Sequence, residues 1–293
     1  MIEKLCIGSA QFGLNYGINN TSGMVSEIEI HKVLSLSLKY NINMIDTAHA
    51  YGQSEERIGK HDLSGWNIVT KIPSIDYGAY FSGVINKFVE SSLARMKIDS
   101  LYGLLIHDTK NFLDHPNYSR ILSDLIDLKN SKIVKKIGLS IYDVSILKRI
   151  DYSDLQHFDI IQCPFNLADQ RLLESPEIIF LKSIGAEIHA RSIFLQGLLL
   201  MNRESRPVQF LKFNQWFESY DAYITNTGYS RLEACLKFAL HTSILDRVIV
   251  GIDSSDQLLE MLSLNLEEKF LKPDQISCNS MDLIDPTRWN SYD

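Results

Sequence analysis

Four ionisable side chains in the first part of the chain lie at or just after the ends of apolar runs. Together, residues of these types could carry out proton transfer. Asp46 follows Met-Ile, Tyr51 comes five residues later, and Lys71 and His107 each close a further apolar run. A free tyrosine has a pKa of about 10, and a nearby ammonium favours the phenolate and lowers that pKa. If Asp46 holds Lys71 charged beside Tyr51, the phenol can donate a proton near neutral pH, and His107 can hydrogen-bond the reacting oxygen.

Such a proton donor suits a carbonyl that is becoming an alkoxide, but the carbonyl carbon also needs an attacking group. The sequence has no Gly-x-Ser-x-Gly elbow and no cluster of metal ligands that would supply one. A hydride cofactor would meet this need. The four residues therefore predict carbonyl reduction, or the reverse oxidation of an alcohol, with Tyr51 as the general acid or base.

The elements that must position these residues alternate along the whole chain. Short runs that are apolar at successive positions, typical of strands covered on both faces, are separated by segments with apolar residues three and four positions apart, typical of helices. We predict strands at residues 5–9, 43–47, 67–72, 101–107, 136–141, 159–164, 187–192 and 247–252. We predict helices at residues 27–40, 54–60, 80–97, 117–131, 143–150, 171–184, 229–242 and 254–264, and Ser26 with Glu29 reads as a capping box.

Eight strand–helix units favour a closed (β/α)8 TIM barrel over an open doubly wound sheet. The spacing of Gly8 and Gly13 after the first strand does not fit the Gly-x-Gly-x-x-Gly turn that an open dinucleotide-binding sheet would carry. We expect one domain spanning residues 1–293. A long irregular region, residues 193–228, follows the seventh strand and should lie over the active site at the C-terminal face of the barrel.

Together these motifs resemble the aldo-keto reductase family. Asp46 and Tyr51 lie in Asp-Thr-Ala-x-x-Tyr-Gly, Lys71 in Val-Thr-Lys and His107 in Leu-Leu-Ile-His, like the catalytic tetrad of that family. The Ser-Glu-Glu-Arg-Ile-Gly segment after Tyr51 is also similar, and the likeness extends from residue 7 to at least residue 260. The resemblance implies a (β/α)8 barrel and NADPH-dependent carbonyl reduction without a metal.

The resemblance also implies where a nicotinamide cofactor would bind. Ser140, in Gly-Leu-Ser, and Gln162, in Ile-Ile-Gln-Cys-Pro-Phe-Asn, match the residues that hold the nicotinamide carboxamide, while Ile141 replaces the Asn that usually follows the serine. Arg191 stands where many members have an aromatic residue under the nicotinamide, and its guanidinium plane could stack there or contact the pyrophosphate. The implied cofactor-binding residues are Ser9, Gln11, Ser140, Gln162, Arg191, Ser192, Gly197, Gly251, Asp253, Ser255, Gln257 and Glu260.

The choice between NADPH and NADH depends on the segment 251–260, which resembles the family's adenosine-phosphate loop and helix. Ser254 and Ser255, which open the predicted helix, form a natural anion site. The segment contains no Lys or Arg, so a 2′-phosphate would need bases from elsewhere, for which Arg203 and Arg206 are the sequence candidates. We expect NADPH, with NADH or dual use as the alternative.

Composition bears on partners and compartment. The net charge of −7 argues against a nucleic-acid partner, which needs a clustered basic face. No apolar run approaches the roughly 18 residues of a membrane span. The four cysteines are not spaced as metal ligands and the N-terminus does not read as a signal peptide, so we expect free thiols in a reducing cytoplasm. Nothing in the sequence indicates an oligomeric state.

The substrate class can be predicted only coarsely. Asp108, Thr109 and Lys110 follow His107 where members that take lipophilic substrates often have Trp, which favours a polar small-molecule carbonyl such as a sugar. The stretches Gln-Phe-Gly-Leu-Asn-Tyr-Gly-Ile and Arg-Ser-Ile-Phe-Leu-Gln-Gly-Leu-Leu-Leu resemble reductase-like proteins associated with surface-polysaccharide synthesis. Two other function classes stay open. One is a non-catalytic nicotinamide-binding regulator on the same barrel, and the other is a lyase or isomerase that uses Lys71 as a Schiff base.

Overall fold

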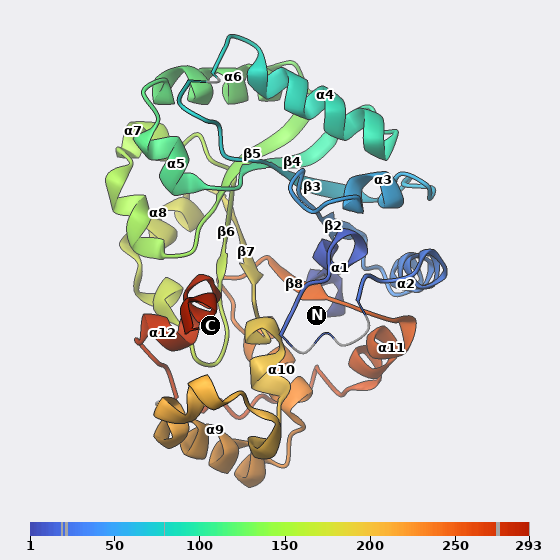
Figure 1. The fold of residues 1–293 in the computed structure, drawn as a ribbon, viewed down its shortest axis with the longest axis vertical. Coiled ribbons are helices and arrows are strands. Elements are labelled where there is room, and N and C mark those ends of the chain that lie inside the picture. The colour runs from blue at the N-terminus through green and yellow to red at the C-terminus, as the bar shows by residue number, and fades with distance from the viewer. Residues whose placement is uncertain (19, 21–22, 79, 274–275, 293) are drawn as a thin grey trace.

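Eight parallel strands close into a barrel in the computed structural model, which describes residues 1–18, 20, 23–78, 80–273 and 276–292 (Figure 1). The strands pair in sequence order, and β1 closes the barrel by pairing with β8. The strands are β1 (Leu5–Gly8), β2 (Met44–Asp46), β3 (Asn67–Ile72), β4 (Leu101–Ile106), β5 (Val134–Ser140), β6 (Ile160–Pro164), β7 (Glu187–Arg191) and β8 (Arg247–Gly251). Each predicted strand is confirmed to within two residues at either end, and so is the (β/α)8 barrel.

Helices surround the barrel wall and connect successive strands (Figure 1). Among the described residues they are α1 (Ala10–Gly13), α2 (Glu27–Lys39), α3 (Ser54–Ile58), α4 (Val84–Met96), α5 (Thr109–Asp114), α6 (Tyr118–Asn130), α7 (Tyr152–Leu155), α8 (Pro176–Ser183), α9 (Asn214–Thr227), α10 (Arg231–Leu240), α11 (Ser255–Ser263) and α12 (Met281–Ile284). The segment predicted as a helix at 143–150 is a 3-10 helix, η2 (Val144–Arg149). None of the helices in the described part of the chain is both long and apolar enough to cross a membrane.

The predicted helix at 171–184 is divided into two. A 3-10 helix, η3 (Arg171–Glu174), comes first, and α8 begins again at Pro176 with the Ser175 side chain as its cap. Proline fits the first turn of a helix, where its missing N–H would have no partner, but not the interior. The apolar spacing therefore predicted the helical segment correctly but did not show where it restarts.

Apolar packing fills both sides of the barrel wall. Inside, six strands contribute one small cluster made of Cys6, Met44, Val69, Leu105, Ile160 and Ile249. Outside, a larger cluster joins the strands to the helices. At Gly138 a Cβ would lie 2.1 Å from the carbonyl oxygen of Ile160, so glycine is needed for β5 to approach β6 this closely. This approach fixes the end of β5, where Ser140 lies.

The segment after β7 is more regular than predicted. It contains three 3-10 helices and the long helix α9; the 3-10 helices are η4 (Leu195–Leu200), η5 (Arg203–Ser205) and η6 (Val208–Phe213). Helix α9 buries only Phe217 and Tyr220 and ends at Thr227, and the next residue, Gly228, has a φ of 72°. So few buried positions leave a weak periodic signal, and 3-10 helices are too short to leave one. The segment does border the active-site cavity, as its predicted position requires.

Candidate active site

Three strand ends and one loop bring the four predicted catalytic residues together. Asp46 ends β2, Lys71 lies near the end of β3, His107 follows β4, and Tyr51 lies in the loop after β2. Lys71 Nζ donates to Asp46 Oδ2 at 2.6 Å and to the carbonyl oxygen of Thr47 at 2.9 Å, and the Lys71–Asp46 pair is buried. Lys71 Nζ lies 5.1 Å from the centre of the Tyr51 ring. The Tyr51 and His107 rings meet edge to face with their centroids 5.7 Å apart.

The protonation states of Lys71 and His107 follow from their surroundings. Burial lowers the pKa of the Lys71 ammonium and the Asp46 carboxylate raises it; on balance that pKa lies above its ordinary value. Burial and the Lys71 charge lower the pKa of His107 to about 4. At neutral pH, Lys71 is therefore a fixed cation and His107 a neutral imidazole with one N–H to donate.

The loop that carries Tyr51 is held against the residues that follow β1. At Gly13 a Cβ would lie 1.9 Å from the Tyr51 carbonyl oxygen, so no other residue fits this contact. The Tyr51 carbonyl accepts a hydrogen bond from Ser54 N at 3.0 Å, and Ser54 Oγ donates to the Ser9 carbonyl at 2.9 Å. Ser9 Oγ in turn donates to the carbonyl oxygen of Asp46 at 3.0 Å. These contacts fix the Tyr51 backbone relative to Asp46.

A cavity of about 930 Å³ opens at the carboxyl ends of the strands. Asp46, Tyr51 and His107 line it, while Lys71 lies buried below them. Ten of the predicted cofactor residues also line it: Ser9, Gln11, Ser140, Arg191, Ser192, Gly197, Gly251, Asp253, Gln257 and Glu260. Gln162 and Ser255 do not. Sequence reasoning missed Tyr142 and Arg231 on the cavity wall, and Tyr142 could have been found as the aromatic residue just beyond the end of β5.

Gln162 lies below the cavity and bonds to the tetrad. It is fully buried, and its Nε2 donates to Asp46 Oδ1 at 2.6 Å. Its Oε1 has no hydrogen-bond partner among the described residues. A buried acceptor without a partner is unfavourable unless a ligand satisfies it. The free oxygen is thus suited to an amide N–H donor such as the carboxamide of a nicotinamide.

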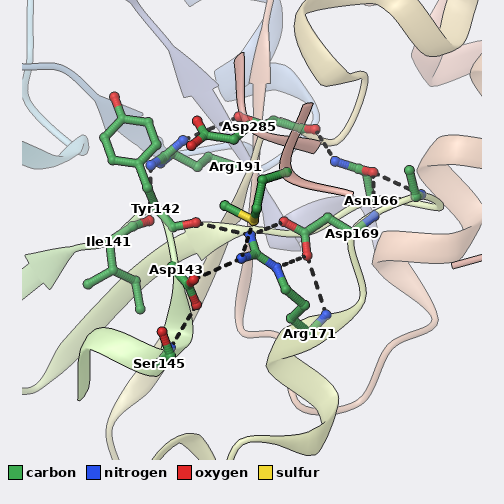
Figure 2. Close-up of polar contacts among 12 residues, drawn as sticks. Ile141, Tyr142, Asp143, Ser145, Asn166, Asp169, Arg171, Arg191 and Asp285 are labelled. Carbon is green, nitrogen blue, oxygen red and sulfur yellow. Dashed lines mark hydrogen bonds and ion pairs between the residues drawn. The ribbon is translucent and has the colours of Figure 1, made fainter. Parts of the chain in front are cut away.

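Arg191 ends β7 and stacks on an aromatic ring instead of pairing with an acid. Its guanidinium carbon lies 4.3 Å from the centre of the Tyr142 ring, and Nη2 donates to the Ile141 carbonyl at 3.0 Å (Figure 2). Among the residues that the structure describes, no carboxylate forms an ion pair with Arg191. The cavity wall therefore presents a flat cation whose charge is available to a ligand.

A second arginine, Arg171, holds the loops after β5 and β6 together (Figure 2). Its Nε and Nη2 each donate to the Asp169 carboxylate at 2.8 Å, and Nη1 lies 3.3 Å from Asp143 Oδ2. Beside it, Asn166 Nδ2 donates to the Ser192 carbonyl at 3.0 Å. This network fixes the backbone around the strand ends that carry Ser140, Gln162 and Arg191.

The loop after β7 reaches the cavity through a constrained backbone. Ser192, Leu195 and Gln196 have φ values of 58°, 48° and 53°, and Gly197 follows at 93°. The left-handed region costs a non-glycine residue roughly 1–2 kcal/mol. Such strain is typical of ligand-binding segments whose geometry is held by surrounding contacts.

The predicted anion site at Ser255 is filled by the chain itself. Ser255 N and Oγ donate to Glu29 Oε2 at 2.8 and 2.9 Å. The predicted capping box is therefore only half formed: Ser26 Oγ accepts from Glu29 N at 3.2 Å, but the Glu29 carboxylate turns to Ser255 instead of back to Ser26. The carboxylate thus lies at the positive end of the α11 dipole.

The two arginines considered for the 2′-phosphate do not line the cavity. Arg206 donates to both oxygens of Asp221, at 2.9 and 2.5 Å, and stacks on Phe217. Arg203 is largely exposed and lies 3.8 Å from Glu218. Both belong to the packing of α9 against η5 and its flanking turns, which a sequence cannot distinguish from a phosphate site.

The polar residues after His107 do not form a substrate wall either. Asp108 caps α5 by accepting from Asn111 N at 2.9 Å, Thr109 donates to the Ser140 carbonyl at 2.9 Å, and Lys110 pairs with Asp114 at 2.7 Å. None of the three lines the cavity. They begin a helix that turns away from the mouth, so the sequence argument for a polar substrate loses this support.

A closed (β/α)8 barrel with a cavity at its C-terminal face is typical of enzymes. The model of the Aldo/keto reductase family matches residues 4–277 of this chain. The chain therefore belongs to the aldo-keto reductases, a family of oxidoreductases that use nicotinamide cofactors in general and act on small carbonyl substrates.

Individual relatives are distant. The chain is 25% identical over 225 residues to D-arabinose 1-dehydrogenase of Saccharomyces cerevisiae (strain ATCC 204508 / S288c). The aligned region covers 70% of this chain and 64% of that protein, so this chain spans just under two thirds of the relative's length. A structure described as an aldo-keto reductase from Pseudomonas aeruginosa superposes with a TM-score of 0.65 at 23% identity, covering 89% of this chain and 88% of that one. The holo form of an aldo-keto reductase from Bacillus halodurans gives 0.71 at 19% identity, covering 92% and 88%. The two structures support the fold alone.

Proposed function

We propose that this protein reduces a polar aldehyde or ketone to an alcohol with NADPH or NADH, and that Tyr51 donates the proton. The observation that carries the proposal is the buried Lys71–Asp46 ion pair beside the Tyr51 ring, at the floor of a cavity of about 930 Å³. That volume lies at the upper end of ordinary small-molecule and cofactor sites.

The cavity fits a nicotinamide cofactor in two respects. Gln162 Oε1 is a buried acceptor for which the described part of the chain supplies no partner, as a carboxamide ligand would require. At Gly251 a Cβ would lie 2.3 Å from Gln11 Nε2, so the absence of a side chain lets the Gln11 amide lie against the cavity wall between β1 and β8. Ser140 and Arg191 would complete the nicotinamide end. A bound nicotinamide would supply the hydride for the carbonyl carbon.

The residues of this chain would handle the proton. Tyr51 gives its hydroxyl proton to the carbonyl oxygen, and the Lys71 ammonium stabilises the phenolate that remains. Asp46 keeps Lys71 charged and in place through the 2.6 Å contact. The neutral imidazole of His107 donates its N–H to the same carbonyl oxygen and so orients the substrate. In the reverse direction the Tyr51 phenolate accepts the proton of an alcohol.

A polar, sugar-like substrate is supported by the cavity wall near the tetrad. Arg191, Tyr16 and Tyr142 bring a cation and two phenol hydroxyls to this wall. The curated relative is named for D-arabinose, a sugar. Hydroxyl-rich substrates need such hydrogen-bonding groups because buried hydroxyls without partners are unfavourable.

The geometry disfavours the two rival functions. As a Schiff-base nucleophile Lys71 would have to be unprotonated and reachable, but it is buried, bonded to Asp46 and Thr47, and has a raised pKa. A non-catalytic regulator would not need the complete tetrad to be assembled. We test both with an assay of NADPH and NADH oxidation against aldoses, keto-sugars and simple aldehydes. Cofactor binding without acceleration by any carbonyl would favour the regulator, and borohydride trapping of substrate on Lys71 would favour the lyase.

We expect the acid limb of the activity profile to lie well below the ordinary pKa of histidine. The pKa of His107 is lowered to about 4, so the imidazole stays neutral from neutral pH down to about pH 5 and protonates only below that. The measurement is kcat/KM for a carbonyl substrate between pH 4 and pH 8 in buffers of constant ionic strength. A loss of activity near pH 6.5 that disappears in His107→Gln would contradict the assignment.

We also expect Arg191→Met to weaken binding of the reduced cofactor by about tenfold or more. The substitution removes from the cavity wall a cation with which no carboxylate of the described residues pairs, and a charge-assisted contact contributes roughly 1.5–3 kcal/mol. The measurement is the Kd by isothermal titration calorimetry. Arg203→Met is the matched control, since it removes an exposed guanidinium that does not line the cavity. Equal affinities for the two variants would show that Arg191 does not contact the cofactor.

A further inference from the structure

Glu29 joins two helices that are far apart in the sequence. It lies in the first turn of α2, next to the N-terminus of α11, and the two helices lie side by side (Figure 1). Its Oε2 accepts from Ser255 N at 2.8 Å and from Ser255 Oγ at 2.9 Å. Its Oε1 accepts from Lys32 Nζ at 2.7 Å. The carboxylate therefore occupies the place where the N-terminus of α11 would attract an external anion.

Glu29 is ionised at neutral pH. The hydrogen bonds from Lys32 and Ser255 lower the pKa of its carboxyl to about 2. The positive end of the α11 dipole is thus already compensated by a charge that belongs to the chain. A phosphate could use the Ser255 N–H only by displacing Glu29, and it would meet the negative charge of that side chain as it approached.

The rest of this end of the cavity is also acidic. The cavity extends from the tetrad to α11, where Asp253, Gln257 and Glu260 line it. Residues 251–260 contain no Lys or Arg. Arg231 lines the cavity too, but it pairs with Asp221 at 2.8 Å. Carboxylates accept hydrogen bonds from ribose hydroxyls, whereas they repel a phosphate that carries nearly two negative charges.

We infer that Glu29 selects NADH over NADPH by filling the anion site at the start of α11. The inference rests on the proposed function, because a dinucleotide whose nicotinamide lies beside Tyr51 would place its adenosine at the α11 end of the cavity. A free ribose 2′-hydroxyl can donate to Glu260 or Gln257. A 2′-phosphate would lie beside Asp253 and Glu260 and could reach the N–H of Ser255 only by displacing Glu29. This reverses the expectation of NADPH that the sequence alone supports.

The experiment measures the Kd values of NADH and NADPH by calorimetry for the full chain and four variants. Wild-type protein should bind NADH at least tenfold more tightly than NADPH. Glu29→Gln removes the charge but keeps an acceptor for Ser255, and it should tighten NADPH binding about tenfold with less than a threefold change for NADH. Glu29→Ala also frees Ser255 and Lys32, so its gain for NADPH should be larger. The control Glu56→Gln removes an exposed carboxylate of α3 outside the cavity and should change neither affinity.

Each other outcome overturns a specific claim. If wild-type protein binds NADPH more tightly, the inference is wrong while the proposed function stands. If wild type prefers NADH but Glu29→Gln leaves the ratio unchanged, Glu29 is not the selecting residue. If Lys32→Met weakens NADPH binding alone, Lys32 grips the phosphate and Glu29 does not exclude it. If neither dinucleotide binds to the folded protein, the proposed function fails and the inference with it.

Discussion

Tyr51→Phe should lower kcat for carbonyl reduction by roughly 10²–10⁴-fold, the contribution expected of a general acid. The substitution removes only the hydroxyl that would give its proton to the carbonyl oxygen. The ring keeps its contacts with Lys71 and His107, so the site should keep its shape. Because the hydroxyl is assigned to the substrate oxygen and not to the dinucleotide, the Kd of the cofactor should stay within a few fold of wild type.

Single-turnover measurement of cofactor oxidation at saturating carbonyl separates this effect from binding. Tyr40→Phe is the matched control, because Tyr40 is an exposed tyrosine at the end of α2, outside the cavity. A Tyr51→Phe protein that keeps more than half of wild-type turnover would remove Tyr51 from its role as proton donor. A large loss of cofactor affinity would instead assign the hydroxyl to binding.

Those parts of the structure that depend on local patterns could be predicted from the sequence. Strands buried on both faces appear as uninterrupted apolar runs, so the sequence alone predicts that Asp46 and Lys71 lie at strand ends. Parallel strands in a barrel open on one face, so residues at these ends had to converge. The observed 2.6 Å contact between Lys71 and Asp46 is the result.

The parts that depend on long-range pairing could not be predicted. Glu29 and Ser26 have the spacing of a capping box, and nothing local indicates that the Glu29 carboxylate bonds instead to Ser255, 226 positions away. In the sequence, Arg206 is a candidate for binding a phosphate, but in the structure it bonds to Asp221 of α9. In both cases the side chain has more than one chemically reasonable partner, and the tertiary fold decides between them.

Lys71→Met should reduce turnover at least as much as Tyr51→Phe. The ammonium lies 5.1 Å from the centre of the Tyr51 ring, where it favours the phenolate over the phenol. Without this cation, and with the Asp46 carboxylate still present, the phenolate is less stable. The phenol is then a weaker proton donor toward the carbonyl oxygen. The measurement is single-turnover cofactor oxidation at saturating carbonyl.

Loss of Lys71 also leaves Asp46 buried without its cation, which typically destabilises a protein by about 3–5 kcal/mol. The double variant Asp46→Asn with Lys71→Met removes both charges and should regain much of this stability in thermal unfolding without regaining activity. Recovery of stability without recovery of activity separates the role of Lys71 in proton transfer from its role in folding. If the Lys71–Asp46 pair were only structural, the double variant would recover stability and activity together. If the folded Lys71→Met protein keeps wild-type turnover, Lys71 does not act on Tyr51 and its role is confined to holding Asp46.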